Sequence, residues 1–584
     1  MNKPRLTYYL TGTMQMLTVI WLFMLTLMSV EVRWAEADAL LLTSLPIVGA
    51  ASIAVFLFCK SKGQITPVDA VIVLWSLYYI GRVYIGAEYP CATESLKMLT
   101  SILLYAVLRL AFHSTRIPAM YLILILIACG TYETLTGIYQ LITGTSRHYL
   151  FLLTGNFLNP GPYSAYLMIA SVAGLSLMQT CETPLSSHLT RLTRFTRLKW
   201  RYVILIPTII MLMLLPSTWS RAAFSGTALC VLWIYRKHWW RYRWVVFIAI
   251  IFLWVGFYFL KRGSADSRGL IWIVSLTSWL HHPWFGVGIG GFRHACAEGI
   301  AEMYQSAPDS HLFDPAGVTD YAYNELIKVM TEQGIIGALL FIAAISLGMV
   351  RLYRSSKPLF MAMLSLLIFS MFSYPSELLP YRIITITTLA WSESTSKNKY
   401  GLSVCRKICI FACLLVVTSG CLLKSEVTER MEQDRDASHF SRMQNAAFLP
   451  DYYELLPYEL DNPQYLFDFA LTLRAEKRLR DSNAILRKGT LVSSDPMFHV
   501  MMGNNYKKMG QYIAAEREYL KAYSMMPNRI YPLYKLMKLY ELKGDRDKCQ
   551  VMARRVYDFM PKIKSSATDD MKKEASRIMA NKNK

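Results

Sequence analysis

The chain has 584 residues, a net charge of +22 and a hydrophobic fraction of 54%. Its 30 Gly, 23 Pro and 11 Cys are ordinary numbers for this length, which excludes collagen-like, disordered and disulfide-scaffold proteins. Aromatic residues at 13% and 30 Met are difficult to bury in one water-soluble core. The basic balance leaves three explanations: nucleic acid, anionic lipid, or the positive-inside orientation of a membrane protein.

Up to about Leu423 the chain is a series of apolar segments of roughly 17 to 25 residues, the length that a helix needs to cross a bilayer. About 12 or 13 such segments predict an all-α polytopic membrane bundle over residues 1–423. Their approximate ranges are 14–30, 37–59, 68–86, 94–112, 117–142, 161–179, 202–217, 219–235, 244–260, 334–350, 358–373, 379–394 and 407–423. The first is long enough to remain as a span, so we expect no cleaved signal peptide.

If the N-terminus is cytoplasmic, most Lys and Arg residues of this region fall in loops on the cytoplasmic side of the membrane, as the positive-inside rule requires. Thirteen spans then place the loop 261–323, and everything after Leu423, on the outer side. The basic run Arg191–Arg201 lies between two predicted spans, so anionic lipid is a simpler partner for it than nucleic acid. The Cys residues lie mostly within spans and suggest no metal site.

After residue 423 the composition becomes charged, Tyr-rich and helical, which predicts a linker over 424–461 and a helical domain over 462–584. From Pro496 onward, small, aromatic, turn and proline residues fall at the positions of a tetratricopeptide repeat of about 34 residues. The matching residues are Gly503, Tyr506, Gly510, Ala515, Tyr519, Ala522, Pro527, Tyr540, Gly544 and Pro561. An unrelated helical-hairpin domain is the alternative. In either case we expect a docking surface for envelope proteins.

Charged residues within or beside the predicted spans are costly in lipid and therefore mark functional candidates. Arg221, at the outer end of span 219–235, has small neighbours that suit close helix packing, which favours a functional role over snorkelling. Arg82, near the outer end of span 68–86, is compatible with both interpretations.

The predicted outer loop and the residues after it contain further candidates. They are Arg268, Trp272, Gly288, His311, Tyr323, Asn324, Glu325 and Glu332. The glycine cluster around Gly288 lacks the Lys-Ser/Thr pair and the preceding strand of a nucleotide-binding loop. We therefore expect this segment to form a turn that re-enters the membrane interface.

Together these motifs resemble the O-antigen ligase and Wzy polymerase family of membrane glycosyltransferases. The motifs are Gly155-Asn156-Phe157-Leu158-Asn159-Pro160, Ser220-Arg221, Arg268 with Trp272, Pro283-x-x-Gly286-x-Gly288-x-Gly290, and Asn324-Glu325 followed by Glu332-x-Gly334-x-x-Gly337. The resemblance covers roughly residues 15–395 and implies a fold related to the GT-C class. It also implies that an outward-facing cavity passes a glycan from a polyprenyl diphosphate to an acceptor, without metal, nucleotide sugar or other cofactor.

By this resemblance Arg221 and Arg268 bind the diphosphate, whose developing charge a guanidinium can stabilise, and Arg82 is a further candidate. The catalytic candidates are His311, Tyr323 and Glu325. The family usually has His directly before the Asn, whereas this chain has Tyr323, a poor base with an ordinary pKa near 10. Asp320 is another possible base, or the base matters less than diphosphate binding. Asn324, Glu332 and Gly288 are expected to support the motifs.

We therefore expect a glycosyltransferase of the bacterial inner membrane that uses an undecaprenyl-diphosphate-linked glycan, with a periplasmic C-terminal domain and no nucleic-acid partner. The acceptor could be a lipid, a glycan or a protein, so ligase, polymerase and protein oligosaccharyltransferase activities remain open. A glycan transporter or flippase would be expected to carry charged relays at the membrane midplane and paired broken helices, which the sequence does not show. A non-catalytic scaffold remains a third possibility because the usual His is missing.

Overall fold

The computed structural model describes residues 3–28, 34–59, 63–85, 88–114, 117–180 except 147 and 149, 196–394 except 261 and 309, 402–404, isolated positions between 414 and 443, and 445–580 except 562 and 563. Helices dominate these residues, as predicted. The named strands among them are β1 (Gly63–Ile65) and β2 (Leu402–Val404), which pair antiparallel. The all-α prediction is therefore confirmed, with one short ribbon that the sequence did not reveal.

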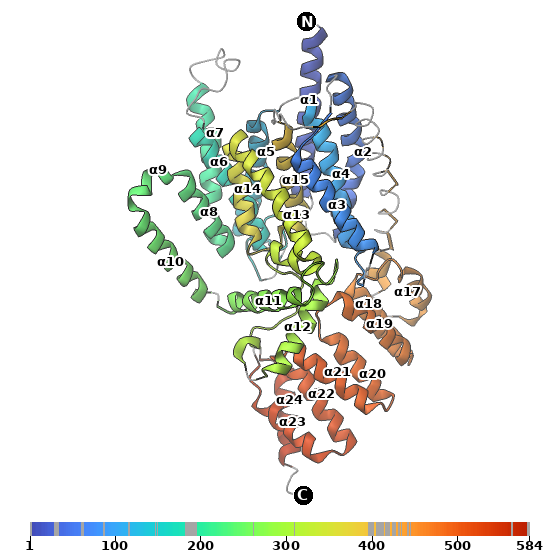
Figure 1. Cartoon of the computed structure of the whole chain (residues 1–584). Helices are drawn as coiled ribbons and strands as arrows, with labels where there is room; N and C mark the ends of the chain where they lie inside the picture. Colours follow the sequence, from blue (N-terminus) through green and yellow to red (C-terminus); the bar gives the residue numbers. More distant parts are fainter. Residues whose placement is uncertain are drawn as a thin grey trace.

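The first part of the chain forms a helix bundle (Figure 1). Its long helices are α1 (Lys3–Met28), α2 (Trp34–Cys59), α3 (Pro67–Tyr84), α4 (Ala92–Ser114), α5 (Ala119–Thr143), α6 (Pro160–Thr180), α7 (Thr196–Leu214), α8 (Arg221–Ile234), α10 (Arg243–Leu260), α13 (Glu325–Ser355), α14 (Lys357–Ser370) and α15 (Leu379–Ser394). Short elements between them are η2 (Pro216–Thr218), α9 (Arg236–Trp239), η3 (Trp240–Tyr242) and η5 (Pro375–Glu377). These helices match the first twelve predicted spans in order, and most of the thirteenth falls outside the described residues.

Five helical segments of the described chain are long and apolar enough to cross a membrane. They are Ala92–Phe112, Ala119–Thr143, Pro160–Thr180, Arg236–Gly256 and Glu325–Ser355. Shorter apolar segments of α1, α2, α7, α8 and α14 accompany them. The chain is thus a polytopic membrane helix bundle.

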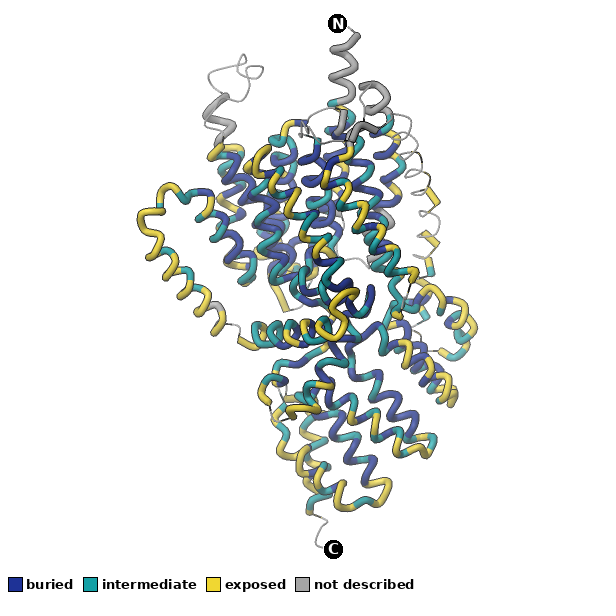
Figure 2. Tube along the Cα trace, in the orientation of Figure 1, coloured by how far each residue is buried: buried dark blue, intermediate teal, exposed yellow. Residues whose placement is uncertain are grey.

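Helix α6 is the centre of this bundle and is buried along most of its length (Figure 2). It packs against α5, α7, α8 and α14. Small residues allow the close approach: a Cβ on Gly130 of α5 would lie 2.6 Å from the Ala170 side chain, and one on Gly174 would lie 2.4 Å from Thr208 of α7.

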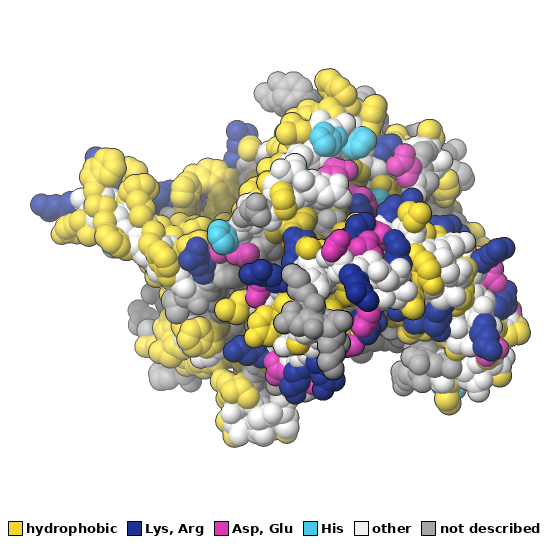
Figure 3. Space-filling view, turned by 90° about the horizontal axis from the view of Figure 1, so that it is seen from below, with side chains coloured by type: hydrophobic (Ala, Val, Ile, Leu, Met, Phe, Trp, Pro, Cys, Tyr) yellow, Lys and Arg dark blue, Asp and Glu magenta, His cyan; other side chains and the backbone are white. Residues whose placement is uncertain are grey.

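Helix α10 projects from the bundle as an arm (Figure 1), and the face seen in Figure 3 is largely hydrophobic. Its sequence is apolar all round after Arg243. Phe252 and Phe259 are among its exposed side chains, and the apolar window over Arg236–Gly256 contains no buried residue. Trp254 contacts Phe372 of the bundle, with ring centroids 5.5 Å apart. A helix that is apolar all round and has few protein neighbours is suited to lipid.

The outer segment and the tail lie together at the end of the bundle opposite the N-terminus (Figure 1). The outer segment contains α11 (Arg262–His281), α12 (Phe292–Ser306) and η4 (His311–Phe313). The tail contains η6 (Ala446–Phe448), α17 (Leu449–Leu455), α18 (Pro463–Ala475), α19 (Leu479–Val492), α20 (Met497–Lys508), α21 (Tyr512–Met525), α22 (Ile530–Lys543), α23 (Arg546–Asp558) and α24 (Ser566–Ala580). Helix α12 packs against α19 and α21 of the tail.

The tail is a stack of helical pairs, α18 with α19, α20 with α21 and α22 with α23, followed by α24. Gly503 of α20 faces the Tyr519 ring of α21, where a Cβ would approach a ring carbon to 2.5 Å. This close packing is the physical reason for a small residue at that position. The tetratricopeptide assignment itself remains a prediction.

Candidate functional site

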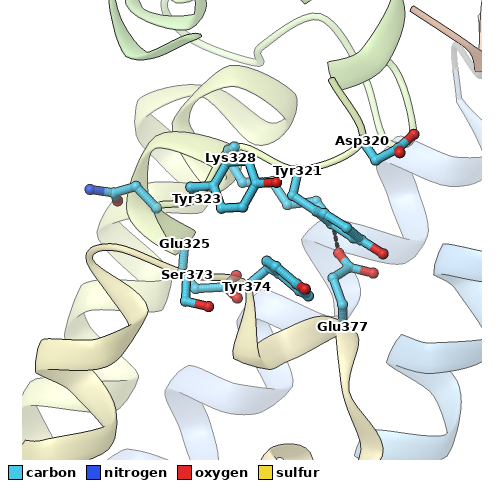
Figure 4. Close-up of a pocket in the computed structure, with 10 residues that line it drawn as sticks. Asp320, Tyr321, Tyr323, Glu325, Lys328, Ser373, Tyr374 and Glu377 are labelled. Carbon is cyan, nitrogen blue, oxygen red and sulfur yellow. Dashed lines mark hydrogen bonds and ion pairs between the residues drawn. The ribbon is translucent and has the colours of Figure 1, made fainter. Parts of the chain in front are cut away.

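A small pocket opens where the bundle meets the outer segment (Figure 4). It contains about 220 Å³ of space, open solvent at its mouth included. Its lining consists of Asp320, Tyr321, Ala322, Tyr323, Asn324, Glu325, Lys328, Ser373, Tyr374 and Glu377. Most of this space is open to solvent and the enclosed part is far smaller than a usual ligand site, so a large substrate would lie mainly outside the pocket.

The segment before α13 is held at both ends. Asn324 caps α13, because its side-chain oxygen accepts from the Ile327 N–H at 3.1 Å. On the other side, Trp272 Nε1 of α11 donates to the Ala322 carbonyl oxygen at 2.9 Å. Tyr323 lies between these anchors with φ of 53°, a conformation uncommon for a non-glycine residue. The predicted supporting residue Asn324 is therefore a helix cap.

Aromatic side chains form one wall of the pocket. The Tyr321 and Tyr374 rings are stacked, with centroids 3.9 Å apart and planes 7° apart. The Tyr323 ring stands nearly perpendicular to Tyr374, at 5.7 Å and 74°. Burial raises the pKa of Tyr321 to about 12. Burial also raises the pKa of Tyr323, although Arg268 opposes the change, so both hydroxyls remain protonated at neutral pH.

Arg268 of α11 approaches the pocket from the tyrosine side, and its guanidinium carbon lies 5.0 Å from the centre of the Tyr323 ring. Burial lowers its pKa, and the positive charge of Arg221 lowers it further. An arginine remains protonated despite such a shift. The structure thus brings together Arg221, Arg268 and Tyr323, which are far apart in the sequence, and places two like charges where an anion would relieve their repulsion.

Arg82 lies at a different place, beside the glycine cluster. Its guanidinium carbon is 5.9 Å from the centre of the Phe285 ring. A Cβ on Gly288, whose φ is +115°, would lie 3.8 Å from an Arg82 terminal nitrogen. The Nε of Arg82 is buried and has no hydrogen-bond partner among the described residues. Arg82 is not among the residues that line the pocket.

The glycine cluster fits into an interruption of α13. Gly334 has φ of 66° and ψ of −166°, which breaks the helical hydrogen-bond pattern. The Ile335 N–H donates instead to the Pro283 carbonyl oxygen at 2.9 Å. A Cβ on Gly334 would lie 2.3 Å from the Trp284 carbonyl oxygen, so no larger residue fits without a shift of the main chain. The two glycine motifs therefore form one joint.

Two further main-chain bonds strengthen this joint. The Val287 N–H donates to the Thr331 carbonyl oxygen at 2.8 Å, and the Gly288 N–H donates to the Glu332 carbonyl oxygen at 3.1 Å. The buried carboxylate of Glu332 also accepts from the Phe292 N–H, at the first residue of α12. Glu332 and Gly288 thus link α12, α13 and the glycine cluster.

Beneath the pocket lies a half-buried ion network that could not be recognised as such from the sequence. Lys97 pairs with Glu94 at 2.8 Å and with Glu377, and Lys328 pairs with Glu94 at 3.2 Å and with Glu377. Lys328 and Glu377 line the pocket, and the dashed line in Figure 4 marks their contact. Charged residues at the start of a predicted span were the available signal, because such charges are rare in lipid.

Replacing Glu377 by Gln is expected to lower the free energy of unfolding by about 2 kcal/mol, because the half-buried charges of Lys97 and Lys328 would have less compensation. Burial raises the pKa of Glu377, but the two ammonium groups outweigh it and hold that pKa well below its ordinary value. The stabilisation is therefore complete above the ordinary Glu pKa of about 4.3 and is lost as the pH falls towards the lower folded pKa.

Thermal unfolding of the detergent-solubilised full chain at several pH values measures this loss. The difference between wild type and Glu377→Gln should shrink at acidic pH. Asp266→Asn is the matched control, since it breaks an exposed pair with Arg262 on α11 and should cost less than about 1 kcal/mol. An equal effect of both variants would contradict the assigned role of the network.

The remaining candidates lie apart or have structural partners. The His311 side chain is 97% exposed, pairs with Asp314 at 3.2 Å and does not line the pocket. Glu325 does line it, but its carboxylate accepts from the Ser376 N–H at 2.8 Å and the Ser376 hydroxyl at 2.6 Å. Asp320 is the most exposed carboxylate of the pocket, with 56% of its side chain accessible.

The motif before α6 has a structural explanation. The Glu133 carboxylate of α5 accepts from the Asn156 main-chain N–H at 3.1 Å and from the Asn156 side-chain amide at 2.9 Å. The Gln140 side chain donates to the Gly155 carbonyl oxygen at 2.6 Å and accepts from the Gly155 N–H at 2.8 Å. These bonds fix the turn that leads into the buried helix α6. No group of three or more His, Cys, Asp or Glu among the described residues could hold a metal ion.

Fold and site together define a polytopic membrane protein with a tyrosine-lined pocket at one end of its bundle and Arg268 beside it. Residues 204–342 match the family model described as O-Antigen ligase, a segment that includes Arg221, Arg268, both glycine motifs and Tyr323. The resemblance seen in the sequence is therefore confirmed for this segment. Glycan transfer is the general activity that this match indicates. No curated protein matches the chain.

Proposed function

We propose that this protein transfers a glycan from a polyprenyl-diphosphate carrier, such as undecaprenyl diphosphate, to an acceptor hydroxyl on the outer face of the bacterial inner membrane. The observation that carries the proposal is the proximity of Arg221 and Arg268 beside the tyrosine-lined pocket. Two guanidinium groups that repel one another form a prepared site for a diphosphate. The O-antigen ligase match across the same residues supports the assignment.

In the proposed reaction, the acceptor hydroxyl oxygen forms a bond to the anomeric carbon of the glycan while the bond to the carrier phosphate breaks. The leaving diphosphate takes the electron pair, and Arg221 and Arg268 stabilise its developing charge. The pocket is too small to enclose the carrier, so the reacting end would lie at its mouth and the rest of the carrier outside it, along the membrane. No metal or nucleotide is needed for this charge balance.

The acceptor proton needs a base, and the pocket favours Asp320 for that role. Tyr323 has a raised pKa and is suited to donating a hydrogen bond rather than to taking a proton. The Glu325 carboxylate is already bound to Ser376. Asp320 lines the pocket and remains accessible to an acceptor. His311 stays a weaker candidate because its side chain points into solvent.

The decisive experiment is mass analysis of lipid-linked glycans and envelope glycans from a deletion strain, joined to transfer by the purified protein. Accumulation of long lipid-linked chains would identify a ligase, and accumulation of single units would identify a polymerase. A missing glycan on envelope proteins would identify a protein oligosaccharyltransferase. Unchanged lipid-linked pools and no transfer in vitro would contradict the proposal.

We further propose that the tail lies in the periplasm and recruits an acidic envelope protein through the first helices of its pairs, α18, α20 and α22. Helix α12 packs against the second helices α19 and α21 rather than against these first helices, of which α18 also packs against α17. Burial and the charges of Lys535, Lys538 and Arg474 lower the pKa of Lys507, while Lys538 itself is paired with Glu574 at 2.7 Å. A cluster of like charges favours an acidic partner.

Neutralising two of these cations, Arg474→Gln with Lys507→Gln, should weaken binding of an acidic probe such as labelled poly-glutamate about tenfold at low salt, with less effect at high salt. Fluorescence anisotropy with the full chain measures this change. Arg480→Gln with Arg517→Gln is the matched control, because it removes the same charge from exposed positions of the second helices. Equal binding by both double variants would contradict the assigned surface.

A further inference from the structure

The segment between α12 and α13, residues 307–324, carries five of the residues that line the pocket, and the tail holds this segment directly. The Thr319 N–H donates to the Ser494 hydroxyl oxygen at 2.7 Å. The Ser494 hydroxyl in turn donates to the Thr319 carbonyl oxygen at 3.0 Å. Both residues are buried, and Thr319 directly precedes Asp320. Ser494 lies between α19 and α20, so a turn of the tail is hydrogen-bonded to the chain beside the pocket.

A second turn of the tail forms hydrogen bonds with the same segment, upstream of Thr319. Asn528, between α21 and α22, donates through its side-chain amide to the Asp314 carbonyl oxygen at 2.8 Å and to the Ala316 carbonyl oxygen at 2.6 Å. These two carbonyls lie on the chain between η4 and Thr319. The segment that leads into the pocket is therefore fixed twice by the tail.

Contacts between α12 and the tail surround these hydrogen bonds and support them. Lys521 of α21 forms an ion pair with Glu298 of α12, and His294 of α12 hydrogen bonds the Thr490 carbonyl oxygen at 2.8 Å. Arg293 of α12 joins both sides, since it lies 3.7 Å from the Asp320 carboxylate and donates to the Val492 carbonyl oxygen at 3.4 Å. The tail is thus packed against the pocket segment itself.

The backbone conformation of Tyr323 shows why the hydrogen bonds from the tail are important. Its left-handed backbone conformation costs free energy and persists only when the surroundings determine it. The Trp272 bond to Ala322 and the Asn324 cap hold the segment close to Tyr323. The bonds of Ser494 and Asn528 hold it further upstream. Without the tail, the upstream half would keep fewer anchors.

We infer that Ser494 and Asn528 are positioning residues for the transfer reaction, and that the tail completes the active site instead of serving only as a docking module. This inference rests on the proposed function. Ser494 fixes Thr319 and so sets the position of Asp320, while Asn528 fixes the chain that leads to it. The two tail residues act through the pocket segment and need not touch substrate.

The test uses the full chain with Ser494→Ala and Asn528→Ala combined. Transfer is expected to fall about tenfold, through the rate at saturating donor more than through donor affinity. Hydrogen exchange of the amides in 314–323 should become faster by about the same factor. Ser494→Thr alone keeps both the hydroxyl and the Asn528 bonds, so it should give wild-type values in both measurements. Ser524→Ala is the matched control: this buried serine bonds only within α21, to the Lys521 carbonyl oxygen.

The exchange measurement also separates a folding defect from a positioning effect, because amides within α18 to α23 should keep their wild-type protection. Unchanged transfer in the double variant would overturn the inference, whether or not exchange becomes faster. Loss of protection throughout the tail would overturn it too, since the residues would then be needed for folding. A wild-type protein that transfers no glycan would contradict the proposed function instead.

Discussion

Replacing Arg268 by Ala should reduce glycan transfer at least about a hundredfold, because the leaving diphosphate would lose one of the two guanidinium groups that stabilise its charge. Arg268 contacts Tyr323, and the positive charge of Arg221 lowers the Arg268 pKa, so its removal leaves Arg221 as the remaining guanidinium of the pair. Transfer by purified protein from a lipid-diphosphate glycan, at several donor concentrations, measures the loss.

Two companion variants make the result specific. Arg268→Lys keeps the charge but not the planar fork, so we expect transfer between that of wild type and that of Arg268→Ala. Arg262→Ala removes an exposed arginine from the same helix α11 and should leave transfer unchanged. If Arg268→Ala retained full transfer, the diphosphate role of the arginine pair would be wrong.

Replacing Gly334 by Ala should destabilise the protein by at least about 3 kcal/mol. The new Cβ would collide with the Trp284 carbonyl oxygen, and Ala would also have to adopt a positive φ. Because the joint between the glycine cluster and α13 places both the outer segment and α13, transfer should fall together with stability. Thermal unfolding in detergent and transfer on the same preparation test both expectations.

Gly263→Ala is the control for this prediction. Gly263 lies in α11, has no atoms within 4 Å of an added Cβ and lacks a positive φ. In a helix Ala is preferred to Gly by roughly 1 kcal/mol, so this variant should be as stable as wild type or more stable. Wild-type stability of Gly334→Ala would show that the main chain of the joint moves easily, contrary to our description.

The bundle could be predicted from the sequence because apolar length is a local property. Each of the twelve long helices coincides with a run of apolar residues that is visible without any tertiary information. The ribbon between β1 and β2 could not be predicted in this way, because its three-residue strands are more than 300 positions apart and have no distinctive pattern. Helix α10 was predicted as a span, but its separation from the bundle depends on contacts that the sequence does not express.

Only part of the site was predicted, because only some of its residues stand out by a local property of the sequence. The arginines stood out because a charge beside a span is costly, and the structure brings Arg221 and Arg268 together. The base could not be assigned from the motif, since exposure and partners decide it: Glu325 is bound to Ser376, and His311 is in solvent. Tyr374 and Glu377 follow α14 in the chain and enter the pocket only through the fold.

The ion network beneath the pocket also makes the electrostatic potential differ between the two sides of the site. Lys97 and Lys328 are balanced by Glu94 and Glu377, so the floor has almost no net charge. The positive potential therefore comes from one side, that of Arg268. An elongated molecule with one charged end and one neutral end would be turned the same way each time it entered, with its neutral end over the stacked tyrosines. A neutral floor beside a positive wall would thus favour one orientation of the substrate.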